Sequence, residues 1–227
     1  MHRKYENYDF QKYRNRYDGP DPFMLTDELT EYMTLKPGMK VLDLGCGNAL
    51  SSLFLAKEFS CTVYAVDADS SSGDNYEFVK EEGVQDKVYP FFAKPDKIPF
   101  GPETFDAMIC INKWHAFGDK ETFFTQYIRP LLKPGAQVGI AAPGITIEAE
   151  EKKDIAEKDV HGAFWSTKRT MEFLDKEFMV SICQEMDTSR EAMLRWYRAA
   201  SPLSDAAPDM QYNLSDDIVI IMTVGSV

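Results

Sequence analysis

The chain has 227 residues, of which 44% are apolar, enough to bury the core of a single α/β domain. Its 25 basic and 37 acidic residues give a net charge of -12, which argues against a nucleic-acid partner and favours a neutral or cationic small molecule. No run of about 18 apolar residues exists, so we expect no stable membrane insertion. The charged, aromatic N-terminus differs from a secretory signal, and the scattered cysteines suit reduced thiols, so we expect a cytoplasmic protein.

Residues 1–36 contain two helical stretches that are interrupted at residues 19–22, Gly-Pro-Asp-Pro. We expect this segment to form a lid over the ligand side of a sheet. Tyr13, Arg14 and Tyr17 are candidates to close over a bound ligand, and Arg14 or Arg16 is a candidate to pair with a ligand carboxylate. The alternative is that the aromatic residues serve packing alone.

The run from Val41 to Ser52, VLDLGCGNALSS, is the most informative part of the chain. Its aliphatic start suits a buried parallel strand, and Gly45 and Gly47 let the backbone turn sharply and approach a ligand closely. Residues 48–59 have apolar residues at helical spacing, so a ligand at the turn would lie against the positive end of a helix. The pattern predicts a nucleotide-type binding turn at the edge of a doubly wound sheet.

A second predicted strand, Val63 to Val66, ends at Asp67, whose carboxylate can accept hydrogen bonds from ribose hydroxyls. For the glycines alone, a tight connection without a ligand is the competing interpretation. A dinucleotide fingerprint requires a third glycine where this chain has Leu50, so diphosphate recognition is poorly supported.

The ordered set of segments resembles the class I methyltransferases that use S-adenosylmethionine. Asp43 to Gly47 matches their glycine motif and Asp67 matches their ribose-binding acid, while residues 105–110 and 131–142 are similar to their fourth and fifth strands. The resemblance implies an α/β, Rossmann-like, doubly wound sheet of seven mostly parallel strands with a reversed last strand. Strands are expected near residues 40–44, 62–66, 88–92, 105–111, 136–142, 178–186 and 217–224.

Residues 19–25 and 111–117 are most similar to small-molecule and lipid-type members, of the methyltransferase type 11 kind. The resemblance implies S-adenosylmethionine as the cofactor. The residues that it assigns to cofactor binding are Asp43, Gly45, Gly47, Asp67, Ala68, Ala93, Lys94, Asn112 and Tyr17.

The chain departs from the family before Ile98-Pro99-Phe100. The family usually has an Asp there that contacts adenine, followed by a backbone amide, whereas this chain has Lys94 and Pro95, and proline has no amide hydrogen. Asp96 is a candidate replacement for the missing carboxylate. Stacking and apolar contact are the other way in which adenine would be held.

For catalysis, His115 follows the fourth predicted strand and is the candidate general base. Its alternative role is a hydrogen bond to a loop carbonyl. Lys113 and Trp114 are expected to shape the pocket, and His161, beside Phe164 and Trp165, is a weaker candidate for the same pocket. No cluster of His, Cys or Asp residues has the spacing of metal ligands, so no metal is predicted.

We expect one domain over residues 1–227. Its parts are a lid at 1–36, a cofactor-binding core at 37–143, a helical cap insert at 144–177 with an exposed acidic helix at 148–159, and closing strands at 178–227 with a helix at 189–200 and a polar loop at 201–215. Arg190, Arg195 and Arg198 on that helix are interpreted as a solvated face.

The predicted function is methyl transfer to a small-molecule or lipid-like acceptor. The alternative from another class is a non-catalytic nucleoside-binding sensor or scaffold, and a third is a nicotinamide oxidoreductase. The sequence leaves the methyl acceptor and the oligomeric state open, a homodimer included.

Overall fold

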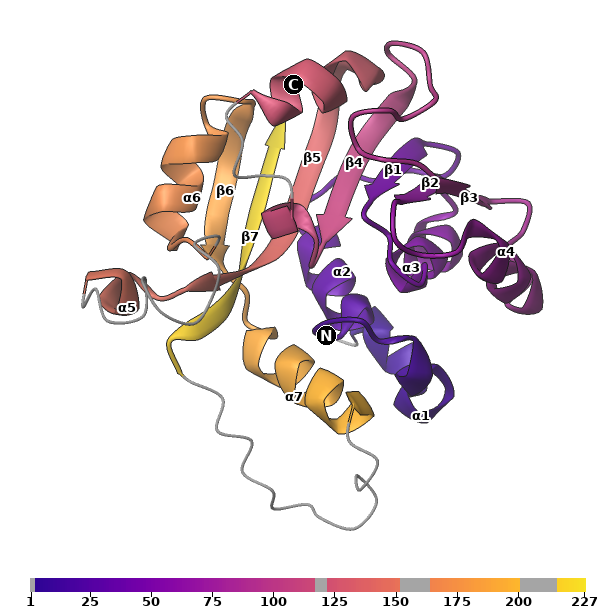
Figure 1. Ribbon diagram of the computed structural model, residues 1–227, viewed down its shortest axis with the longest axis horizontal. Helices are drawn as coiled ribbons and strands as arrows, with labels where there is room; N and C mark the ends of the chain where they lie inside the picture. Colours follow the sequence, from indigo (N-terminus) through magenta and orange to yellow (C-terminus); the bar gives the residue numbers. More distant parts are fainter. Residues whose placement is uncertain (1–2, 117–121, 152–163, 201–215) are drawn as a thin grey trace.

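The computed structural model describes residues 3–116, 122–151, 164–200 and 216–227. Seven strands form one sheet in the order β3-β2-β1-β4-β5-β7-β6, seen side by side in Figure 1 with β3 at the right and β6 at the left. The strands are β1 (Lys40–Leu44), β2 (Thr62–Asp67), β3 (Val88–Phe92), β4 (Phe105–Ile111), β5 (Leu132–Ile145), β6 (Met179–Glu185) and β7 (Ile218–Ser226). β7 runs antiparallel to both of its neighbours, which confirms the predicted reversed last strand.

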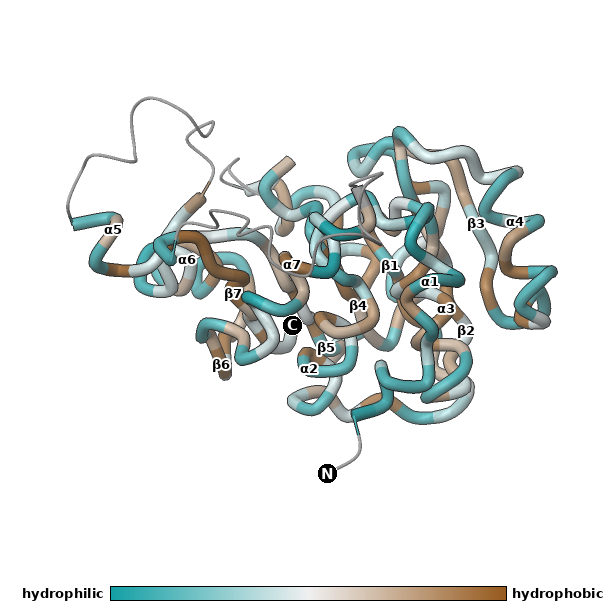
Figure 2. The backbone as a smooth tube through the Cα atoms, turned by 90° about the horizontal axis from the view of Figure 1, so that it is seen from below, coloured by the Kyte–Doolittle hydropathy of each residue, from teal (hydrophilic) through white to brown (hydrophobic). Residues whose placement is uncertain are grey.

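Helices cover both faces of the sheet because the central strands are apolar on both sides. Val41 in β1 packs against the cluster that includes residues of α2 (Pro22–Thr30), α3 (Leu50–Phe59), α4 (Ser72–Glu81) and α7 (Ser189–Ala200). Leu42 and Leu44 face the other cluster, which includes η4 (Phe124–Ile128), η5 (Arg129–Leu131) and α6 (Thr167–Leu174). Figure 2 shows the hydrophobic stretch of β7 between these layers. The result is a three-layer α/β/α domain.

β5 is longer than the predicted segment 136–142. It continues through Pro143 and Gly144 to Ile145 and pairs with β7 along the whole length from Gln137 to Ile145. Pro143 is paired with Ile220 of β7. Pro-Gly tends to end a strand, but here the pairing with an antiparallel neighbour extends it.

The N-terminal segment consists of η1 (Lys4–Asn7), α1 (Phe10–Tyr13) and η2 (Arg14–Arg16), followed by α2. Asp21 caps α2 by accepting the amide of Phe23 at 2.9 Å, and all nine residues of α2 are buried. α2 is therefore a core helix packed between the sheet and its neighbours, so within the predicted lid only the part before α2 reaches the ligand end of the sheet.

The insert after β5 is helical at its described ends, in α5 (Ile147–Glu151) and α6. His161, most of the acidic stretch at 148–159 and the polar loop at 201–215 lie outside the described residues.

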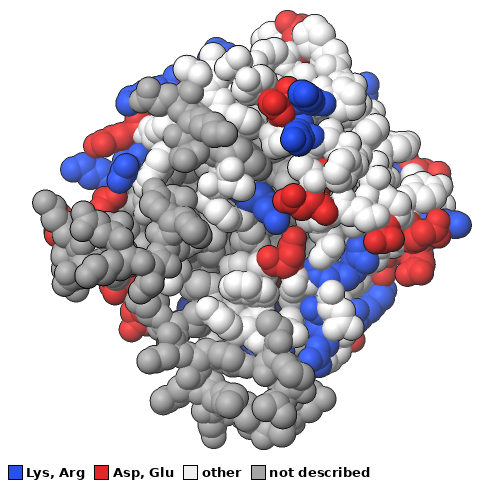
Figure 3. Space-filling view, viewed as in Figure 1, with Lys and Arg blue, Asp and Glu red and all other residues white. Residues whose placement is uncertain are grey.

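The arginines predicted as a solvated face of α7 are each paired with an acid. Arg195 Nη1 lies 3.1 Å from the buried carboxylate of Asp21, while Arg190 pairs with Asp216 and Arg198 with Glu191. On the face shown in Figure 3, acidic and basic side chains lie beside one another. Of the described helices, none is both long and apolar enough to span a membrane.

Candidate functional site

The backbone amides of the turn after β1 are hydrogen-bonded to the end of β2. Gly45 and Gly47 have φ values of +72° and +52°, which favour glycine. The amides of Gly45 and Cys46 donate to the Val66 carbonyl at 2.8 and 3.2 Å, and the Gly47 amide donates to Asp67 Oδ2 at 3.0 Å. A diphosphate site needs free amides at this turn. These three are engaged, so the turn suits a nucleoside ligand without a diphosphate.

Asp67 ends β2 beside this turn and is only 6% exposed. Besides Gly47, the amides of Asp69 and Ser70 donate to its Oδ1 at 2.7 and 2.8 Å. A carboxylate offers about four lone-pair positions. Three are used, which leaves capacity for about one ligand hydroxyl, and the neighbouring carboxylate of Asp69 is within the same cavity wall.

A cavity of about 450 Å³ opens at this end of the sheet, and we call it the first cavity. Five of the residues assigned to cofactor binding line it: Gly45, Asp67, Ala68, Ala93 and Lys94. The other lining residues are Leu44, Val66, Asp69, Pro95, Asp96, Lys113, Ala116, Phe123 and Tyr127.

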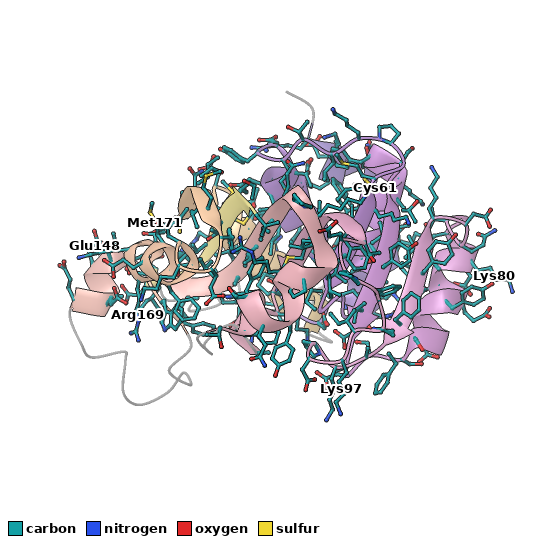
Figure 4. All side chains as sticks on the ribbon, turned by 90° about the horizontal axis from the view of Figure 1, so that it is seen from above. Cys61, Lys80, Lys97, Glu148, Arg169 and Met171 are labelled. Atoms are coloured by element: carbon teal, nitrogen blue, oxygen red, sulfur yellow. The ribbon has the colours of Figure 1, made fainter. Side chains whose placement is uncertain are left out.

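The segment that departs from the family forms one wall of the first cavity. Lys94, Pro95 and Asp96 all line it, and the turn is closed by a hydrogen bond from the Lys97 amide to the Lys94 carbonyl at 2.9 Å. Lys97 itself points away from the molecule (Figure 4). Asp96, the candidate replacement carboxylate, thus lies in the wall of the first cavity.

Asp43 does not line the first cavity. Its carboxylate is fully buried and accepts the hydroxyls of Ser51 and Ser52, in the first turn of α3, at 2.6 and 2.5 Å. Burial raises the pKa of Asp43 to about 6, with a further contribution from Asp67. In this structure Asp43 joins β1 to α3. It would therefore affect a ligand indirectly, by holding the glycine turn in position.

Asn112 and Tyr17 also lie outside the lining of the first cavity. Asn112, at φ +62°, donates through Nδ2 to the Pro20 carbonyl at 2.8 Å and so ties the end of β4 to the N-terminal segment. The ring of Tyr17 packs 5.6 Å from that of Phe10, and burial together with Asp21 raises the pKa of its phenol.

The N-terminal segment is fastened directly to the glycine turn. Arg16 donates to the Asn48 carbonyl at 3.1 and 3.2 Å and to Asn75 Oδ1 at 2.9 Å, and its guanidinium lies over the Phe78 ring. Arg16 is therefore occupied in holding the turn. A side chain added at Gly47 would collide with the carboxylate of Asp18, which lies against the turn.

A second cavity, of about 370 Å³, adjoins the first, and Lys113 lines both. Its wall is mostly apolar and aromatic, with polar side chains from Asp18, Asn112, Lys113 and His115. The lining residues are Asp18, Gly19, Pro20, Asn112, Lys113, His115, Pro143, Phe164, Met193, Trp196, Tyr197, Ile218 and Ile220.

His115, the candidate base, lines the second cavity and not the first. Burial, and to a lesser degree the charge of Lys113, lowers its pKa, so the imidazole is neutral at pH 7. Its Nδ1 is buried with no hydrogen-bond partner among the described residues, which leaves Nε2 as the nitrogen available to a ligand. The ring lies 5.8 Å from Phe164.

Lys113 stands between the two cavities. Its Nζ is 3.8 Å from Asp18 Oδ2, close enough for charge attraction but too far for a hydrogen bond. Burial raises the pKa of Asp18, and Lys113 opposes that rise. An ammonium carries three N–H donors, and Asp18 is its one ion-pair partner among the described residues, so donors remain available to a ligand.

The sequence analysis missed the contribution of α7 and β7 to the second cavity. Met193, Trp196 and Tyr197 form its wall from α7, and Ile218 and Ile220 contribute from β7. The i, i+3, i+4 spacing of the three residues on α7 is an amphipathic signal that could have indicated a buried face. Across the described residues, no group of three His, Cys, Asp or Glu side chains has the arrangement of a metal site.

Comparison with known proteins bears on this arrangement. A family model described as a methyltransferase domain matches residues 41–135, which include the glycine turn, Asp67 and Lys94. Residues 41–135 match that family, in agreement with the resemblance of the chain to class I S-adenosylmethionine-dependent methyltransferases. Methyltransferase GfsG from Streptomyces halstedii is 28% identical over 153 residues, which are 66% of this chain and 54% of that protein. The chain thus spans about half the length of that relative.

Solved structures share the fold of this chain. A putative sarcosine dimethylglycine methyltransferase from Galdieria sulphuraria has a TM-score of 0.67 at 16% identity, with 90% of this chain and 84% of that chain covered. The [4+2]-cyclase SpnF has a TM-score of 0.68 at 15% identity, with 89% and 79% covered. At such identities the likeness establishes the fold alone, and the cyclase is named for a reaction other than methyl transfer.

Proposed function

We propose that this chain transfers a methyl group from S-adenosylmethionine, bound in the first cavity, to a small-molecule acceptor bound in the second. The observation that carries the proposal is that the two cavities adjoin at Lys113, with the glycine turn and Asp67 on one side and an aromatic wall on the other. A group-transfer enzyme needs this side-by-side arrangement of its two ligands.

The first cavity suits the nucleoside and the charge of this cofactor. Asp67 is available to a ribose hydroxyl, Gly45 leaves the wall free of a side chain, and Asp96 lies at the edge of the adenine-side segment. Asp18, Asp43 and Asp67 gather around the glycine turn: besides burial, the charge of Asp67 raises the pKa of Asp18, and the charges of Asp67 and Asp18 raise the pKa of Asp43. A sulfonium cation is attracted by such a group of carboxylates.

When bound, the cofactor supplies a methyl carbon that forms a bond to the acceptor while its bond to sulfur breaks and the electron pair stays on sulfur. The residues of the chain then have to align the acceptor, exclude water and receive a proton. The aromatic wall of the second cavity performs the alignment, and His115, neutral at pH 7, is placed to receive the proton. Alignment of this kind contributes up to about 7–11 kcal/mol in intramolecular reactions.

The test is a calorimetric titration with S-adenosylmethionine and S-adenosylhomocysteine, followed by an acceptor screen that measures S-adenosylhomocysteine formation. We expect saturable binding that Asp67→Ala weakens at least about tenfold, because a carboxylate hydrogen bond is lost. Asp106→Ala is the matched control. Asp106 also accepts a backbone amide and a lysine, from Lys40 and Lys133, but its partners begin β1 and β5 at the opposite end of the strands. Binding of neither compound, or equal losses in both variants, would refute the proposal.

A non-catalytic nucleoside-binding scaffold is the second candidate. It is favoured by the replacement of the usual adenine contacts by Lys94 and Pro95. Cofactor binding without turnover of any acceptor would support it. Competitive binding of NADH would instead support the oxidoreductase alternative, which the engaged amides of the glycine turn disfavour.

A further inference from the structure

We propose, on the basis of the function above, that the acceptor is a phenol: an aromatic compound whose hydroxyl lies between Lys113 and His115 while its ring packs in the second cavity. The volume of about 370 Å³ is at the low end for small-molecule sites, so a compound of one or two rings fits.

The aromatic side chains in the wall of the second cavity favour an acceptor that contains an aromatic ring. Trp196 and Tyr197 lie with ring centroids 5.2 Å apart on α7, and Phe164 lies across from His115 at 5.8 Å. Aromatic side chains favour stacked or edge-on contacts with another ring. The remaining wall residues from β7 and α7 are Ile218, Ile220 and Met193, which favour an acceptor that is apolar apart from its reacting group.

The charged side chains of the second cavity favour a hydroxyl as the reacting group of the acceptor. An ammonium acceptor would be repelled by Lys113, and the nearest carboxylate, Asp18, is already drawn to that lysine at 3.8 Å. An acceptor with a fixed negative charge would be attracted by Lys113 but would bring no proton for His115 to accept. A neutral group that becomes negative only as it reacts meets neither objection.

A phenol also matches the acid–base capacity of the site. The pKa of a phenol is about 10, and an adjacent cation lowers the pKa of an acid by about 1–3 units, whereas an aliphatic alcohol is a much weaker acid. Lys113 has donors available to hold the phenolate oxygen, and Nε2 of the neutral His115 accepts the phenolic proton. The new carbon–oxygen bond then forms to the oxygen that lost this proton, so atoms and charges balance.

The experiment uses two sizes of ring and three substituents on each. The probes are 4-methylphenol and 2-naphthol, their methyl ethers, and the corresponding aminomethyl compounds. Each is titrated into the protein saturated with S-adenosylhomocysteine, and the phenolate absorbance of the bound phenols is followed against pH. S-adenosylhomocysteine formation from S-adenosylmethionine is measured separately with each probe.

We expect a phenol to bind more tightly than its aminomethyl counterpart, with its apparent pKa lowered by at least about one unit, a tenfold preference for phenolate. Lys113→Met should restore the pKa of the free phenol. Lys97→Met, which changes a lysine pointing away from the molecule (Figure 4), should leave the bound pKa unchanged. Methyl transfer should be detected with a phenol and be absent with the ethers.

The outcomes separate this inference from the function on which it rests. If S-adenosylmethionine binds but neither phenol binds, if the aminomethyl compounds are the better ligands or substrates, or if Lys113→Met leaves the phenol pKa lowered, the phenol inference is refuted and the proposed function stands. If S-adenosylmethionine does not bind, the proposed function fails, and the inference about its acceptor fails with it.

Discussion

The two cavities are built in different ways, although they meet at Lys113. The first is formed chiefly by the turns that follow consecutive parallel strands, β1, β2 and β3, and its contacts are largely backbone ones around Gly45 and Asp67. The second is formed by side chains from segments far apart in the chain, from Asp18 to Ile220. We call the first cavity the cofactor half of the site and the second cavity the acceptor half. The difference predicts that backbone geometry controls cofactor affinity, whereas the tertiary contacts that anchor α7 control acceptor affinity.

The largest effect is expected for Gly47→Ala, which tests the backbone half. At φ +52° an alanine costs about 1–2 kcal/mol, and its Cβ would also displace the Asp18 carboxylate and disturb the amide that donates to Asp67. We expect cofactor affinity, measured by calorimetry, to fall by at least about 100-fold, or roughly 2.7 kcal/mol.

Gly135→Ala is the control for this change. Gly135 has φ +76° and nothing within 4 Å of an added Cβ, so it imposes a similar backbone strain far from any collision. It should lower the free energy of unfolding and leave cofactor affinity intact. Equal affinities in the two variants would show that the glycine turn does not control the cofactor half.

The contrast between the halves also explains what the sequence could predict. The glycine turn, Asp67 and all seven strands follow from residues close together in the chain, because the turn needs φ above zero and the strands need apolar alternation. The second cavity could not be assembled from the sequence, since Trp196 and Ile220 meet only through the antiparallel return of β7. Asp43 was assigned to the cofactor through its place in the glycine motif, whereas its packing against Ser51 and Ser52 is visible only in three dimensions.

Asp43→Asn should give the next largest effect, which we measure on the free energy of unfolding. A carboxyl whose pKa is raised on folding stabilises the fold below its unfolded pKa, and this contribution is lost as pH rises through about 6. The shift of about two units corresponds to at most roughly 3 kcal/mol. Urea unfolding at pH 5 and pH 8 should show wild type losing more stability than Asp43→Asn over this interval.

Asp106→Asn provides a control of opposite sign for Asp43. Although burial opposes it, the hydrogen bonds from Lys133 and from the Lys40 amide lower the pKa of Asp106, so its contribution is present at pH 8 and lost in acid. The same pH dependence in both variants would mean that Asp43 is not held as a buried, easily protonated carboxyl.

Glu28→Gln tests the tertiary anchoring of the acceptor half. The buried carboxylate of Glu28 accepts the amides of Asp187 and Thr188, at 2.7 and 2.9 Å, just before α7 begins. An amide can accept only through its oxygen, so one donor loses its partner at a cost of about 2 kcal/mol. We expect a lower free energy of unfolding and weaker binding of 2-naphthol, with unchanged affinity for S-adenosylhomocysteine.

Glu31→Gln is the matched control on the neighbouring turn. Glu31 lies at the surface and forms an ion pair with Arg3. Surface ion pairs contribute little to stability, so loss of this pair should lower the free energy of unfolding by less than about 1 kcal/mol. A parallel loss of cofactor and phenol affinity in Glu28→Gln would contradict the separation of the two halves.

The smallest effect is expected from the titration of His115, where the two halves touch. Burial first and Lys113 second lower its pKa, so protonation of the folded protein is disfavoured and stability falls as pH drops below about 6.5. His115→Gln removes this dependence and should therefore be more stable, relative to wild type, at pH 5 than at pH 8, by less than about 1 kcal/mol. The imidazole resonance of His115, assigned by its absence in His115→Gln, should titrate below pH 6.5. Lys113→Met should move that titration upward, because the cation that opposes protonation is gone. A midpoint that Lys113→Met leaves in place would mean that burial alone sets the pKa and that Lys113 does not act on the base across the shared wall.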